Sequence, residues 1–414
     1  MKRSDFMYEL PERLIAQNPA AERTASRLMV VNRNRQTIEH GHFEDLKNYL
    51  VQGDCLVFND TKVMPARLLG KKKTGQGNGV VVPERIISAA TTANTVVTPV
   101  REVSSDDAID KLGEELPAAG AVSVTAAADA VVMPRQEATA TVEVLLLHKV
   151  RPTVWEAMVR PGKRLKAGAQ ITLGNGELNA EVLEVLGNGN RLVRFFCPDE
   201  DFKDILSRNG QIPLPPYITN CTVDRSRYQT VYANDTGSAA APTAGLHFTK
   251  EYIAQIRAAG IDTAYLTLHV GPGTFQPVKA ENIEDHRMHS EFYRIGGDAV
   301  ARINQVKTAQ QGDKASEYQG RVVAVGTTSV RTLESAADEH GLLQATEGWT
   351  DIFIYPGYRF RCVDMLLTNF HLPGSTLLML VSAFADRDLV MEAYRQAVEQ
   401  EYRFFSFGDA MLIL

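Results

Sequence analysis

Cysteine is scarce in this chain, with only four in 414 residues and no C-x-x-C pair among them. Zinc ribbons and small disulfide-bonded domains need cysteines at short, regular spacing. The scarcity argues against both classes, and the four side chains are predicted to be reduced packing residues: Cys55, Cys197, Cys221 and Cys362.

Long apolar runs are also missing. The most apolar segment, Thr376 to Ala385, is about half the roughly 20 residues that a membrane-spanning helix needs, so it is expected to be a buried strand or helix. Near the N-terminus, Glu9, Pro11 and Glu12 interrupt the chain before a signal peptide could form. A cytoplasmic protein that does not associate with membranes is expected.

Three common nucleotide-binding or hydrolase motifs are absent: G-x-G-x-x-G, G-x-x-x-x-G-K-[ST] and G-x-S-x-G. Their absence disfavours dinucleotide oxidoreductases, P-loop ATPases and α/β-hydrolases. What is present is the composition of a globular protein, with 44% hydrophobic and 23% charged residues. The length favours two domains.

Charge is divided unevenly along the chain, although its net value is only −6. Residues 76–140 hold four Lys and Arg against nine Asp and Glu. The pieces on either side, 62–75 and 141–198, hold thirteen Lys and Arg against five Asp and Glu, a local charge of +8. A basic module therefore lies beside acidic ones, so the net charge does not argue against a nucleic-acid partner.

The basic module has the pattern of a small antiparallel barrel. Short β-type runs follow one another between Gly- and Asn-containing turns, as in AQITLG, LNAEVLEVL and RLVRFF. Residues 76–140 are rich in Ala, Thr, Val and Ser without clean periodicity, which is typical of a flexible insertion. Removing them joins ARLLGKKKTG to TVEVLLLHKV, and these two runs would make a hairpin.

Alternating strands and helices flank the barrel. HFEDLKNYL (42–50) is predicted to be a helix, and CLVFND a strand. Thr249 to Ala259 should be a helix ending at Gly260, with strands at IDTAYLTLHVG, RVVAVG and DIFIYPG, and helices at TTSVRTLESA and 389–402. We predict an α/β domain interrupted by a small antiparallel β-barrel, with the α/β domain at 1–61 and 199–414 and the barrel at 62–198.

Five polar runs could converge on a ligand because each follows a strand or precedes a helix: RYQTVYA, APTAGLHF, LHVGPGTF, AVGTTSVRTLE and TNFHLPGST. Unpaired N–H groups after Gly326 would favour a carboxylate or phosphate, although an N-cap at Thr327 or Thr328 is the simpler interpretation. Arg331 and Glu334 would make an ordinary surface pair.

Five histidines in the motif-rich part are possible acids or bases: His247, His269, His286, His289 and His371. A lone histidine is more often structural. His286, His289 and Glu291 hint at a metal site, but their spacing and the lack of a fourth ligand disfavour one. No metal is expected.

Together the motifs resemble those of the S-adenosylmethionine:tRNA ribosyltransferase-isomerase family. Besides the five runs, CLVFNDTKVMPARLLG, GQIPLPPYI, IFIYPGYRF and YRFFSFGDAMLI occur in the family's order, so the resemblance covers nearly the whole chain. Residues 76–140 are extra relative to the hairpin turn that the family leads us to expect.

The resemblance implies that S-adenosylmethionine is consumed as a substrate and that no cofactor is needed. Its ribosyl unit would move to 7-aminomethyl-7-deazaguanine at the tRNA wobble position, giving epoxyqueuosine with release of adenine and methionine. The implied partner is the anticodon arm of a tRNA, and the protein is expected to be a monomer.

The resemblance also assigns site residues. The catalytic candidates are His247, His269, His371 and Arg227. The substrate-binding candidates are Tyr228, Gln229, Thr243, Gly245, Gly273, Thr274, Phe275, Gly326, Thr327, Thr328 and Arg331. Those for tRNA are Lys71, Lys72, Lys73, Arg160, Lys163, Arg164 and Lys166. Two other functions stay open, an S-adenosylmethionine-dependent RNA methyltransferase and a non-catalytic RNA-binding protein.

Overall fold

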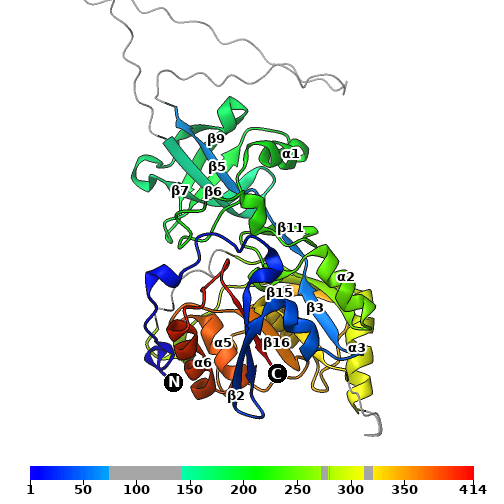
Figure 1. Ribbon diagram of the computed structural model, residues 1–414. Coiled ribbons are helices and arrows are strands. Elements are labelled where there is room, and N and C mark those ends of the chain that lie inside the picture. The colour runs from blue at the N-terminus through cyan, green and yellow to red at the C-terminus, as the bar shows by residue number, and fades with distance from the viewer. Residues whose placement is uncertain (74–140, 272–277, 279, 312–319) are drawn as a thin grey trace, which may run out of the picture. The chain divides into compact units, whose positions relative to one another are not determined.

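The computed structural model describes residues 1–73, 141–271, 278, 280–311 and 320–414 (Figure 1). The predicted flexible insertion at 76–140 lies outside the described residues. So do three of the substrate-binding candidates, Gly273, Thr274 and Phe275.

A nine-stranded mixed sheet forms the centre of the α/β part, in the order β15-β13-β12-β3-β14-β16-β17-β1-β2. The strands are β1 (Arg27–Asn32), β2 (Thr37–His42), β3 (Cys55–Asn59), β12 (Asp262–Leu268), β13 (Glu291–Ile295), β14 (Val322–Val325), β15 (Thr346–Thr350), β16 (Met365–Asn369) and β17 (Ala410–Ile413). The four middle strands β12, β3, β14 and β16 run parallel. Such strands are covered on both faces, which explains why every residue of β3 is buried.

Helices cover both faces of this sheet. Apolar residues of α3 (Gly297–Gln311), α4 (Thr327–Ala336), α5 (Thr376–Ala385) and α6 (Arg387–Glu399) belong to the core on one face. On the other face lie α2 (Lys250–Ala258) and the 3₁₀ helix η4 (Phe43–Tyr49). As predicted, α2 ends just before Gly260, whose φ is +79°. Its N-cap is Thr249, whose side chain accepts from the backbone N–H of Tyr252.

The helix predicted at 42–50 is present as the 3₁₀ helix η4, which buries Phe43 and Leu46 against the sheet. One element prediction was wrong. DIFIYPG is not a strand, because β15 ends at Thr350 and the chain then turns without sheet pairing. The apolar segment at 376–385 is the buried helix α5, and among the described helices none is long and apolar enough to cross a membrane.

The basic module is a closed six-stranded barrel in the order β10-β7-β6-β5-β8-β9. Its strands are β5 (Arg67–Lys72), β6 (Thr141–Arg151), β7 (Val154–Arg160), β8 (Gln170–Leu173), β9 (Leu178–Val185) and β10 (Arg191–Phe195), followed by α1 (Asp199–Asn209). β5 and β6 pair antiparallel, so the predicted hairpin is confirmed. An α/β fold interrupted by a small antiparallel barrel is therefore confirmed, while the domain boundaries at 61 and 198 remain predictions.

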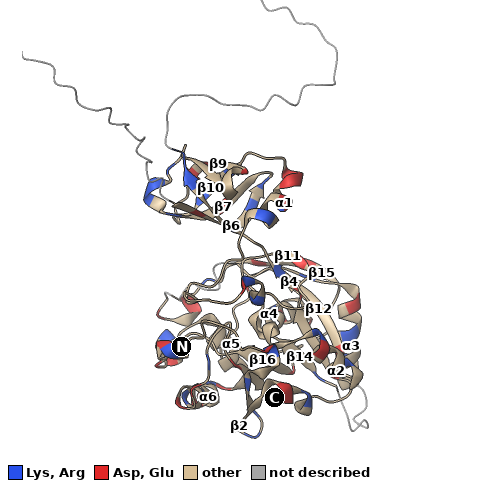
Figure 2. Cartoon of the chain, turned by 45° about the horizontal axis from the view of Figure 1, so that its top comes forward, with Lys and Arg blue, Asp and Glu red and all other residues tan. Residues whose placement is uncertain are grey.

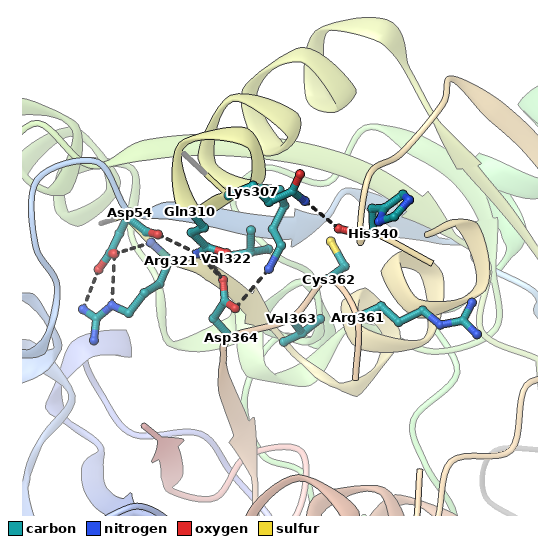
Figure 3. A network of polar contacts seen from close by, with 12 residues as sticks. Asp54, Lys307, Gln310, Arg321, Val322, His340, Arg361, Cys362, Val363 and Asp364 are labelled. Atoms are coloured by element: carbon teal, nitrogen blue, oxygen red, sulfur yellow. Dashed lines mark hydrogen bonds and ion pairs between the residues drawn. The ribbon is translucent and has the colours of Figure 1, made fainter. Parts of the chain in front are cut away.

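Two carboxylates, one fully buried and one partly buried, fix the amino ends of the middle strands (Figure 3). Fully buried Asp54, before β3, accepts from the backbone and guanidinium of Arg321. Asp364, before β16, accepts from the backbone N–H of Val322 and from Lys307 at 3.1 Å. These contacts fix the starts of three adjacent strands, β3, β14 and β16. The carboxyl ends of the same strands lie at the opposite edge of the sheet, where a site can form.

The four cysteines are free thiols, as predicted. Burial raises the pKa of Cys55 to about 12, which keeps it in the unreactive thiol form.

Candidate active site

A pocket opens at the carboxyl ends of β14 and β16 and encloses about 710 Å³, including open solvent at its mouth. Three motif segments line it: residues 240–244, the start of α4, and the turn 368–372. The fold thus brings together five of the predicted site residues: Thr243, Gly326, Thr327, Thr328 and His371. Ligands commonly bind at this edge of a parallel sheet, because helix N-termini and loops meet there.

The start of α4 carries unused hydrogen-bond donors. Gly326 is the N-cap, with φ +90°, so the prediction of a threonine cap was wrong. Thr328 Oγ1 is buried without a partner among the described residues, and so are Nε and Nη2 of Arg331, one turn later. Buried donors at a helix N-terminus favour an anionic ligand.

Arg331 and Glu334 are not a surface pair. Both are buried, at 4% and 3% exposure, and they contact different groups. Arg331 Nη1 donates to Glu291 Oε2, and Glu291 Oε1 accepts from the backbone N–H of Gly271. Glu334 accepts from three successive backbone N–H groups, at 361–363. The i,i+3 spacing suggested contact, but both side chains turn to buried partners outside the helix.

His371 lines the pocket. Its Nε2 lies 2.8 Å from Thr368 Oγ1, and its backbone N–H and carbonyl bond to the hydroxyls of Tyr394 and Tyr8. Burial lowers its pKa to about 3. The imidazole is therefore neutral at physiological pH, and these contacts hold it in one position.

His247 is buried among protein groups and does not line the pocket. Its Nδ1 lies 2.7 Å from Ser26 Oγ, its Nε2 lies 3.1 Å from Asn369 Nδ2, and its ring stacks on Phe43. Burial, helped by the positive charge of Arg23, lowers its pKa to about 3. Through Asn369, which does line the pocket, His247 contacts the site indirectly.

His269 occupies a different environment, with its side chain 20% exposed. Its Nδ1 lies 2.8 Å from Thr61 Oγ1, and its Nε2 lies 4.0 Å from Asp235 Oδ1. Burial lowers its pKa, and Asp235 opposes that shift. Its neighbour Val270 lines the pocket.

Three other candidates in the Arg227 to Gly245 stretch contact other parts of the protein and not the pocket. Arg227 donates to the carbonyls of Ala20 and Ala21, and Gln229 bonds both backbone groups of Val63. Tyr228 is fully buried in an apolar cluster. None of these three lines the pocket.

Gly245 does not line the pocket either. A Cβ there would lie 1.8 Å from Tyr232 Oη, so it serves close packing. Sequence reasoning missed Thr368 and Asn369, although both stand in the TNFHLPGST run. It also missed Thr61 and Asp235, which nothing in the sequence joins to His269.

The suggested metal ligands do not cluster. Among the described residues, no group of three His, Cys, Asp or Glu side chains could hold a metal ion. Glu291 instead pairs with Arg331, and His286 packs against the ring of Phe353.

Lys and Arg residues lie at several places on the barrel (Figure 2), and the strand registers place the basic candidates at one of its ends. In the strand registers, Lys71 and Lys72 at the end of β5 face the starts of β6 and β8. Arg160 ends β7 opposite Glu143, near the start of β6. Lys163, Arg164 and Lys166 follow in the β7–β8 connection. All seven basic candidates have exposed side chains: Lys71, Lys72, Lys73, Arg160, Lys163, Arg164 and Lys166.

The sequence matches the family model described as queuosine biosynthesis protein, over residues 3–131 and 121–413. A protein of Acetivibrio thermocellus named S-adenosylmethionine:tRNA ribosyltransferase-isomerase is 47% identical over 413 residues, covering 100% of both chains. A relative of the same name from Caldanaerobacter subterraneus is 45% identical over 414 residues, again covering 100% of both. The crystal structure of an S-adenosylmethionine tRNA ribosyltransferase from Thermotoga maritima is 34% identical, covering 99% of this chain and 100% of that one, with a TM-score of 0.47.

Proposed function

The chain belongs to the queuosine biosynthesis protein family, and from this premise we propose that it is an S-adenosylmethionine:tRNA ribosyltransferase-isomerase. It transfers the ribosyl unit of S-adenosylmethionine to the aminomethyl group of 7-aminomethyl-7-deazaguanine at the tRNA wobble position. The ribosyl unit isomerises to the epoxycyclopentane of epoxyqueuosine, and adenine and methionine leave. S-adenosylmethionine is a substrate here, and the reaction needs no cofactor or metal.

The pocket carries this proposal, because its groups match the substrate's charges. The methionine carboxylate would accept from the start of α4 and from Thr328 Oγ1, with the unpartnered donors of Arg331 close by. The rings of Tyr217, Phe370 and Phe405 line the same pocket and would attract the sulfonium.

His371 is the pocket's base in this proposal. The sulfonium acidifies the ribose C5′ protons, and a neutral imidazole at the pocket wall can remove one of them. His269 is the second candidate, since it lies beside Val270 and keeps partial exposure. His247 then positions Asn369 and is not a catalytic group.

The barrel is the proposed tRNA-binding part. Seven exposed cations at one end would contact the phosphates of the anticodon arm, which makes binding depend on salt. The protein acts as a cytoplasmic monomer in this proposal.

Release of free adenine tests the reaction. Purified protein with S-adenosylmethionine and tRNA carrying 7-aminomethyl-7-deazaguanine should yield adenine and methionine in equal amounts, measured by chromatography. The same tRNA with unmodified guanine is the control and should yield neither. Formation of S-adenosylhomocysteine would instead indicate a methyltransferase, and binding without turnover an RNA-binding protein.

Charge reversal tests the barrel. The double variant Lys163→Glu/Arg164→Glu is expected to weaken tRNA binding and to reduce the slope of log Kd against log salt by about one to two, since each lost phosphate contact removes about 0.9. The matched control is Lys149→Glu/Arg151→Glu, at the opposite end of β6. Equal loss in both variants would contradict a localised site.

A further inference from the structure

Trp349 is the most exposed large apolar side chain in the described part of the chain, at 69%. It lies on β15, which forms one edge of the nine-stranded sheet. Burying an indole is favourable, so a ligand that covered Trp349 would gain binding free energy from the contact.

Trp349 belongs to an aromatic row that leads inward to a predicted catalytic residue. In the sheet register it faces Phe292 of β13, with ring centroids 5.8 Å apart and planes at 71°. Phe292 stacks in turn on His269, at 5.7 Å and 25°. We define these three residues, His269, Phe292 and Trp349, as the aromatic row.

The surroundings of the row are polar. Arg294 lies two residues after Phe292 on the same face of β13, is 50% exposed, and pairs with Asp235, which also lies near His269. Glu347, opposite Arg294 in the register, is exposed as well. A protein partner would need a wider apolar patch than one indole.

A single flat ligand fits this arrangement better than a protein partner does. Phe292 meets the indole at a steep angle and not face to face, so the indole can take a second ring in stacked contact. Bases stack on aromatic side chains in this way, and only unpaired bases have their faces available. We propose that Trp349 is a stacking platform for an unpaired base of the RNA substrate, placing the loop beside His269.

This inference rests on the proposed function for its RNA substrate, yet its test needs no turnover. The chain has two tryptophans, and the other, Trp155, is 9% exposed and packs in the barrel against Phe202. In a Trp155→Phe background, tryptophan emission reports on Trp349 alone.

The probe is an RNA stem–loop with a seven-base unpaired loop, compared with a blunt duplex carrying the same number of phosphates. Binding of each is followed separately by anisotropy of a labelled RNA. The stem–loop is expected to quench Trp349 emission saturably, and the duplex to bind without comparable quenching. Binding of the stem–loop without quenching, or equal quenching by both RNAs, would overturn the proposal.

Variants supply the second measurement. Trp349→Ala should raise the KM for tRNA by about five- to a hundred-fold, the range for loss of one stacked base. Trp349→Phe should restore most of it, and the KM for S-adenosylmethionine should not change. The control is Phe196→Ala, a 50% exposed aromatic after β10, at the end of the barrel away from its seven cations. An unchanged KM in Trp349→Ala, or an equal rise in the control, refutes the platform.

Two further outcomes are decisive. If the emission of Trp349 shifts with protein concentration in the absence of RNA, a second copy of the chain covers it and the proposal is wrong. If the stem–loop quenches but no adenine is released from the modified tRNA, the platform stands and the proposed reaction falls.

Discussion

Replacing Arg331 with alanine is expected to destabilise the fold by about 3 to 5 kcal/mol, the usual effect of removing one partner from a buried ion pair. The reason is the Glu291 carboxylate, 4% exposed, which would lose its guanidinium partner inside the protein. Urea unfolding without ligand measures the change. A loss below about 1 kcal/mol would mean that water screens the pair as it does at a surface.

Arg331→Lys separates stability from ligand binding. Lysine keeps the charge beside Glu291 but lacks the planar donors that are unpartnered in the structure, Nε and Nη2. Unfolding should change much less than in the alanine variant, while S-adenosylmethionine binding should weaken. The decarboxylated analogue is the control, since it should bind the two proteins equally. If Arg331→Lys weakened binding of S-adenosylmethionine and of the decarboxylated analogue equally, the methionine carboxylate would not lie beside Arg331.

Replacing His371 with alanine is expected to lower kcat by about 10²- to 10⁴-fold, the usual contribution of a general base. The KM for S-adenosylmethionine should change little. His269→Ala is the comparison, because the two side chains are the competing candidates, and the larger loss of adenine release identifies the base. Full activity in His371→Ala would exclude it.

The pH profile gives an independent check on His371. An ordinary histidine loses its basic form below about pH 6.5, whereas His371, with a pKa lowered to about 3, stays neutral across the range from 3 to 6.5. The rate should therefore show no acid limb near pH 6.5. In the unfolded chain His247 and His371 bind protons in this range, so stability falls as pH drops from 6.5 towards 3. Rates are accordingly read only where circular dichroism shows folded protein.

Local patterns predicted much of the fold. Alternation and turn residues located the barrel, and Gly260 located the end of α2, because each signal lies within a few residues of its element. The pattern at 42–50 gave the buried face of a helix but not its type. DIFIYPG was apolar enough for a strand, and only the sheet order reveals that no neighbour pairs with it.

The site was harder to predict because its contacts span the chain. Motifs identified His371 and the start of α4, but whether a histidine faces a ligand or the protein depends on partners far away in the sequence. The His247 imidazole contacts Ser26 and Asn369, and the His269 imidazole contacts Thr61 and lies near Asp235. The Arg331–Glu291 pair likewise joins helix and strand residues that no local pattern connects.

The register of β5 with β6 bears on how this protein tolerates changes in length. Lys71 pairs directly with Thr141, so the chain leaves and re-enters the barrel at adjacent positions, whatever lies between them. The entropic cost of joining two such points grows only logarithmically, about 0.6 kcal/mol for each doubling of the connection. Homologues can therefore lengthen or shorten this hairpin with little effect on barrel stability, which makes it a suitable place to insert a tag or a reporter domain.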